Sequence, residues 1–185
     1  MKRNFLFAVA LSLLAVAGVS AQKSANFSGH WELDPAKSKI EGRRIDAMTL
    51  DVTQTAKDIK VDTNTTRAPR PDANTPNPTG APGGMGRSFG GFGGDTSVTY
   101  TLDGTETTIQ QEGPNGPLPV KLTGKLDAGK LNLSSIRIFN GPNGQISISS
   151  KESWTLSPDG KTLTINREQS SPRGNTTLEL VFAKK

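Results

Sequence analysis

Residues 151–167 read KESWTLSPDGKTLTINR. Apolar and polar residues alternate on both sides of the sequence SPDG at 157–160. An alternation with a period of two is typical of a β-strand that has one face in a core, and Pro, Asp and Gly together are typical of a tight turn. The stretch therefore predicts an antiparallel hairpin.

The register of this hairpin predicts an ion pair on its apolar face. We align the two strands by placing Leu156 opposite Leu163. Glu152 then lies opposite Arg167, on the same face as Trp154, and directly opposed Cβ atoms are about 4.5–5.5 Å apart. Three interpretations are open. The pair satisfies itself and fixes the register, it anchors the polar head of a ligand, or the register differs and both groups face solvent.

The same alternation recurs along the chain, at 48–53, 98–102, 120–126, 163–165 and 178–182. Short turn sequences rich in Gly, Asp, Asn and Pro separate these runs, so consecutive strands are expected to be antiparallel neighbours. We predict an all-β fold, an antiparallel up-and-down meander of about 8–10 strands. Closure into a barrel would remove the exposed edges of such a meander; a β-sandwich is the alternative architecture.

Two segments interrupt the strand pattern. Asp34 followed by Pro35 is typical of a helix start, so a short helix or an ordered loop is expected from Asp34 to about Arg44. Residues 65–94 are rich in Gly and Pro and contain few aliphatic side chains. Such a composition cannot bury enough apolar surface to offset the entropy of ordering, and we predict a disordered insertion between two strands.

The first 21 residues have the three parts of a cleavable signal peptide. Lys2 and Arg3 give a positive start, an apolar run follows at 5–16, and small residues precede a cleavage position near Ala21. We therefore expect an exported protein, periplasmic or secreted, with a single β-barrel domain at 22–185. The sequence has no cysteine, so its stability must come from packing and backbone pairing.

Residues 26–31, NFSGHW, resemble the N-F-x-G-x-W region that opens lipocalin-like barrels. The longer stretches FSGHWELDPAKSK and SPDGKTLTI resemble small exported bacterial proteins, largely uncharacterised, that are described as lipocalin-like (calycin-type). The resemblance implies a barrel with the Trp31 indole at its closed end. It also implies a small ligand inside the barrel. The chain departs from the family in ending on a predicted strand, and its longest insertion comes later than the family's lid loop.

These features together give six candidate ligand-binding residues, all expected to face inward. They are Trp31, Tyr100, Glu152, Trp154, Arg167 and Phe182. For the aromatic residues, packing in a filled core is the alternative role.

The residues that catalysis usually requires are sparse. The one histidine, His30, has the parity of an outward-facing residue. The chain has no cysteine, no Gly-x-Ser-x-Gly motif and no metal-ligand spacing. We therefore expect no catalytic residues, no metal and no cofactor.

The leading functional hypothesis is an exported binding protein for a small apolar or amphipathic molecule. A non-catalytic structural or interaction protein of the cell envelope is the alternative, and an enzyme of unknown reaction is third. The formal net charge is +5, but Lys and Arg are spread along the chain, which argues against a nucleic-acid partner. The basic residues Lys37, Lys39, Arg43 and Arg44 are either a solvated surface or a weak contact for anionic envelope components.

Overall fold

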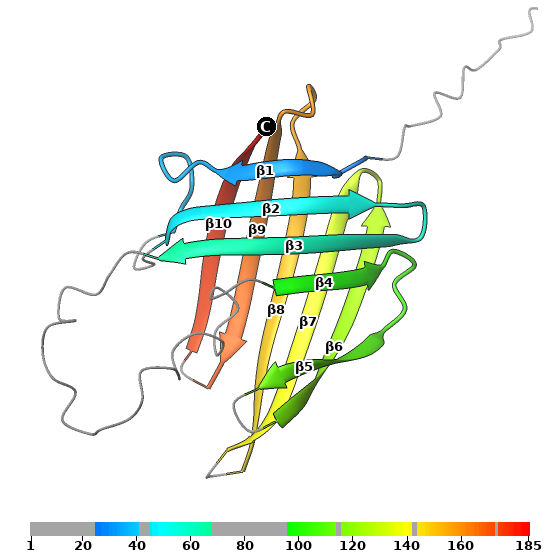
Figure 1. Ribbon diagram of the computed structural model, residues 1–185, viewed down its shortest axis with the longest axis vertical. Helices are drawn as coiled ribbons and strands as arrows, with labels where there is room; N and C mark the ends of the chain where they lie inside the picture. The colour runs from blue at the N-terminus through cyan, green and yellow to red at the C-terminus, as the bar shows by residue number, and fades with distance from the viewer. Residues whose placement is uncertain (1–24, 41–44, 68–95, 114–115, 142–143, 173) are drawn as a thin grey trace, which may run out of the picture.

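The computed structural model describes residues 25–40, 45–67, 96–113, 116–141, 144–172 and 174–185. In these ranges the chain forms ten β-strands (Figure 1). They are β1 (Gly29–Leu33), β2 (Ile45–Gln54), β3 (Asp58–Arg67), β4 (Thr96–Thr101), β5 (Thr107–Gly113), β6 (Gly116–Asp127), β7 (Lys130–Gly141), β8 (Gly144–Leu156), β9 (Thr162–Ser171) and β10 (Gly174–Lys184). All the observed pairings are antiparallel, and the predicted all-β meander is confirmed.

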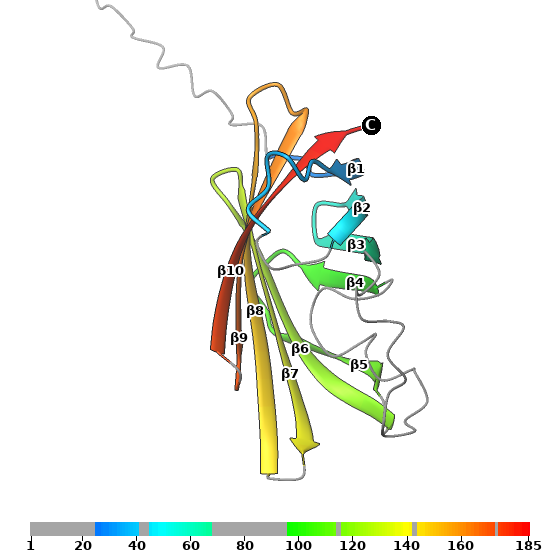
Figure 2. The same cartoon turned by 90° about the vertical axis from the view of Figure 1, so that its left-hand side faces the viewer.

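The ten strands belong to one sheet, in the order β4-β3-β2-β1-β10-β9-β8-β7-β6-β5. The pairing of β1 with β10 joins the first and the last strand, with Leu33 opposite Phe182. The sheet curls so that β1–β4 cross in front of β6–β10, and the side view shows the two layers (Figures 1 and 2). A single curled sheet is a nearly closed barrel. The barrel prediction is therefore confirmed over the sandwich.

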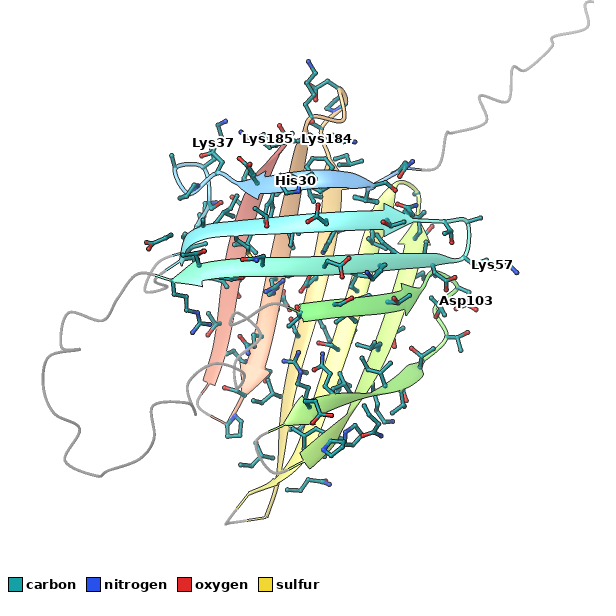
Figure 3. The ribbon with its side chains drawn as sticks, in the orientation of Figure 1. His30, Lys37, Lys57, Asp103, Lys184 and Lys185 are labelled. Atoms are coloured by element: carbon teal, nitrogen blue, oxygen red, sulfur yellow. The ribbon has the colours of Figure 1, made fainter. Side chains whose placement is uncertain are left out.

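The barrel is incomplete between β4 and β5, which are the two ends of the sheet order. At one end of this gap, the segment that follows β4 hydrogen-bonds directly to β6 and closes the barrel there. Gly104 N–H donates to Gly124 O at 2.9 Å and Leu126 N–H donates to Leu102 O at 3.4 Å. Asp103, which belongs to the segment after β4, is labelled in Figure 3. We call the contact of residues 102–104 with residues 124–126 the seam.

The apolar core fills the half of the barrel nearest β1. Its largest fully buried side chains are Trp31, Trp154, Phe27, Phe182, Leu50, Ile59, Leu122, Leu131, Leu163, Ile165, Leu180 and Val120. They come from eight of the ten strands and from the segment before β1. We call this half the packed end.

The predicted hairpin is present as β8 and β9. Leu156 lies opposite Leu163, Trp154 opposite Ile165 and Glu152 opposite Arg167, as the alternation predicts. The connecting turn is closed by Ser157 N–H donating to Thr162 O at 2.9 Å.

The structure describes a part of each of the two segments that were expected to interrupt the strand pattern, 34–44 and 65–94. Residues 35–37 form turns and not a helix, and Lys39 then bridges to Glu179 of β10. The ordered-loop alternative holds for the part of 34–44 that the structure describes. Strand β3 extends to Arg67 because it pairs with β2 up to Ile45, so the first three residues of the predicted insertion at 65–94 are strand. The rest of that insertion and the predicted signal peptide lie outside the described residues.

Within the described ranges, no helix has the length and apolar character needed to cross a membrane.

Candidate functional site

The hairpin β8–β9 places an ion pair on the inner face of the barrel. Arg167 Nη2 lies 2.7 Å from Glu152 Oε1, and the two side chains are 10% and 14% exposed. The Trp154 indole N–H donates to Glu152 Oε2 at 2.8 Å. The carboxylate is thus held by two side chains, one from its own strand and one from the next.

Tyr100 of β4 and Arg137 of β7 bring further polar groups toward this pair. Burial raises the pKa of Tyr100 well above its usual range, and the nearby Glu152 charge acts in the same direction. Arg167 and Arg137 oppose the shift. The phenol is therefore a neutral hydroxyl at physiological pH. We call Tyr100, Arg137, Glu152 and Arg167 the interior polar cluster.

Arg137 lies on the inner face because it shares its parity with the buried residues Leu131 and Leu133 of the same strand. Its Nε donates to Gln111 Oε1 of β5 at 3.1 Å. Burial lowers the pKa of Arg137, with Arg167 adding to the effect and Tyr100 opposing it. The side chain is only partly buried, and a guanidinium keeps its proton in proteins.

Apolar side chains surround Arg137 on the half of the barrel away from β1. They face inward by parity with the buried core positions of their strands or, for Ile109, by pairing with the buried Val120, yet each remains partly exposed to solvent. They are Val98, Ile109, Leu118, Ile146 and Ile148. We call this half, with Arg137, the open end; its strand segments lie in the lower part of Figure 1.

The remaining predicted site residues lie in the packed end. Trp31 and Phe182 are fully buried, and the Trp31 indole donates to Phe27 O at 2.9 Å. Trp154 makes an edge contact with Phe27, with ring centroids 6.1 Å apart. These three aromatic side chains therefore pack the core, and only Trp154 also touches the interior polar cluster.

Outer-face charges are paired near β1. His30 lies on the outer face, as predicted from its parity (Figure 3), with Nδ1 2.6 Å from Asp51 Oδ1. Of the predicted basic patch, Lys37 pairs with Asp34 at 2.9 Å and Lys39 with Glu179 at 3.1 Å. Arg43 and Arg44 lie outside the described residues.

The described residues contain no group of three or more His, Cys, Asp or Glu side chains that could hold a metal ion.

Comparison with known proteins gives a likeness to solved structures and not to sequences. No protein-family model matches the chain, and no curated protein sequence matches it. Among solved structures, the chain is similar to the zebrafish ileal bile acid-binding protein complexed with cholic acid. The two sequences are 15% identical, and the alignment covers 86% of this chain and 98% of that one, with a TM-score of 0.46.

Sequence reasoning missed Arg137 and Gln111. The signal for Arg137 was its parity with Leu131 and Leu133, which places it on the apolar face. Its partner Gln111 lies on β5, two strands away in the sheet order.

Proposed function

We propose that the protein binds a small apolar or amphipathic molecule in the open end of its barrel. The observation that carries this proposal is the contrast between the two ends of the interior. Inward-facing residues of the packed end are almost fully buried, such as Trp154 at 1% and Leu163 at 0%. Inward-facing apolar residues of the open end, such as Ile146 and Ile148, stay partly exposed.

Partly exposed apolar surface on the inner face is a source of binding free energy. Covering it contributes about 25 cal/mol for each Å² of apolar surface removed from water. Small-molecule sites typically combine such apolar lining with a few polar groups that fix the orientation of the ligand. The open end has this composition, because its apolar side chains adjoin the interior polar cluster.

Tyr100 supports an orienting role for the cluster. Its raised pKa keeps the hydroxyl protonated, so it can donate a hydrogen bond to a ligand oxygen. Arg137 is a second donor from the facing side of the barrel. A ligand with an apolar body and a polar end would satisfy both parts of this lining.

The test uses the neutral fluorescent probe N-phenyl-1-naphthylamine, whose emission rises in apolar surroundings. We expect saturable binding to the purified protein, with quenching or a shift of the emission of Trp154, which touches the cluster through Glu152. Ile148→Gln is expected to weaken binding by making the lining polar. Its matched control is the outward-facing Ile136→Gln on the neighbouring strand. A wild-type protein that binds neither this probe nor any alkyl ligand would refute the proposal.

A further inference from the structure

Arg137 is a charged group in an apolar setting. Its neighbours across the sheet are Val120 on β6 and Ile148 on β8. Both are apolar, and Val120 is 1% exposed. Placing a guanidinium between them is costly unless it is paired.

The described groups that face Arg137 do not neutralise it. Gln111 on β5 is its hydrogen-bond partner and is neutral. Tyr100 on β4 is neutral, and Arg167 on β9 carries the same charge as Arg137. Among the residues that the structure describes, no carboxylate lies within ion-pair distance of Arg137.

Glu152 on β8 is the one carboxylate of the interior polar cluster, and both of its oxygens are engaged. Oε1 lies 2.7 Å from Arg167 and Oε2 accepts the Trp154 indole N–H. An anion that approached Arg167 would meet the charge of Glu152. An anion that approached Arg137 would meet a guanidinium whose hydrogen bond to Gln111 uses only Nε.

From this arrangement we infer that the molecule bound in the open end is an amphipathic anion, and that Arg137 binds its negatively charged group. This inference rests on the proposed function and narrows its ligand class. The apolar part of the ligand lies against Ile148 and its partly exposed neighbours. The charged group is an oxyanion, such as a carboxylate or a sulfate, because a guanidinium presents paired N–H donors that match two oxygens.

The experiment compares ligands that share one ten-carbon chain. Decanoate, decyl sulfate, decanol and decyltrimethylammonium are each used to displace N-phenyl-1-naphthylamine from the wild-type protein. A hydrogen bond to a charged group is worth about 1.5–3 kcal/mol. The two anions are therefore expected to bind about tenfold or more tightly than decanol, and the cation more weakly than decanol. The two anions also distinguish a carboxylate ligand from a sulfate ligand.

Three variants test the role of Arg137. Arg137→Gln is expected to lose the preference for anions, so that decanoate and decyl sulfate bind no more tightly than decanol. Arg137→Lys keeps the charge and is expected to retain part of the preference. Arg67→Gln on β3 makes the same chemical change at an exposed position, and is expected to leave all four affinities unchanged.

The possible results separate three claims: the anionic ligand class, the role of Arg137 and the proposed function itself. Equal binding of decanoate and decanol by the wild type would overturn this inference and leave the proposed function standing, and this comparison needs no variant to fold. An anion preference that survives in a folded Arg137→Gln variant would overturn the assignment to Arg137. Failure of all four ligands to displace the probe, with no binding of the probe itself, would refute the proposed function.

Discussion

Glu152 shows at the scale of one residue how the interior polar cluster is held. Its carboxylate is fixed by Arg167 from the facing strand and by the indole of Trp154. A buried ion pair gives little net stability over apolar packing, but removing one partner leaves an unpaired charge and costs about 3–5 kcal/mol. The pair therefore fixes the register of the hairpin more than it strengthens the fold.

Tyr100 gives a prediction at the same scale, because it is the only tyrosine of the chain. Its pKa is raised by burial and by Glu152, so the folded protein favours the protonated phenol. This stabilisation is fully present below pH 10, the ordinary pKa of tyrosine. It is lost as the pH rises above that value. We expect the near-ultraviolet absorbance of phenolate to appear at a higher pH in the native protein than in denaturant.

The matched control for this titration is Tyr100→Phe. This variant has no phenolate signal, and its stability is expected to fall less than that of the wild type between about pH 10 and pH 11. Coincident titration of the native and denatured proteins would show that Tyr100 is not buried as the structure has it.

The interior pair and Arg137 also show what a sequence reveals about single residues. Glu152 and Arg167 could be predicted because a short turn links their strands, so local alternation sets the register. Arg137 could not be predicted with the same ease. Its parity with Leu131 and Leu133 predicts that it faces inward. The apolar neighbours Ile136 and Ile138 have the other parity, and they predict that Arg137 faces outward.

Strand β6 shows at the scale of one element how the barrel closes. Val120 and Leu122 face the core, and the next inward position is Gly124. A Cβ atom at Gly124 would lie 2.5 Å from Thr101 O and 2.9 Å from the Tyr100 Cβ. Only a glycine lets the chain after β4 approach β6 closely enough for the hydrogen bonds of the seam.

Gly124→Ala is therefore expected to open the seam. Overpacking at a tight contact typically costs about 1–3 kcal/mol, and we expect a loss of this size in the free energy of unfolding, measured in urea. The outward-facing Thr123→Ala on the same strand is the control, with an expected loss below about 1 kcal/mol. Because Gly124 lies against Tyr100, a shift of the chain there is expected to expose the phenol and let it ionise at a lower pH in Gly124→Ala. Wild-type stability together with an unchanged Tyr100 titration would contradict this view of the seam.

The seam also shows where sequence reasoning about elements ends. Alternation and turn sequences predict strands and their sequential pairing, because both are local. The contact of residues 102–104 with residues 124–126 skips over β5. It depends on how far the whole sheet curls, which no local pattern specifies.

At the scale of the whole molecule, the interior has a packed end that stabilises the fold and an open end to which we assign the proposed binding. Joining β1 to β10 brings Trp31, Phe182 and Trp154 together at one end, where they exclude water. Lys184 extends over this end, with Nζ 5.1 Å from the centre of the Trp31 ring. Its side chain passes so close to Gly29, at φ +146°, that a Cβ atom there would lie 2.6 Å from Lys184 Cε. The N-F-x-G-x-W segment thus builds the packed end, and the open end is left to other strands.

Two alanine substitutions should separate these roles. Phe182→Ala removes a fully buried ring of the packed end, and is expected to cost about 3–5 kcal/mol of unfolding free energy. Ile148→Ala removes a partly exposed side chain of the open end, and is expected to cost less than about 2 kcal/mol. The binding of N-phenyl-1-naphthylamine should change in the opposite order, because only Ile148 lines the proposed site. Urea unfolding and probe titration measure both properties on the same samples. If Phe182→Ala stayed as stable as the wild type, or if Ile148→Ala left probe binding unchanged, the division between the two ends would be wrong.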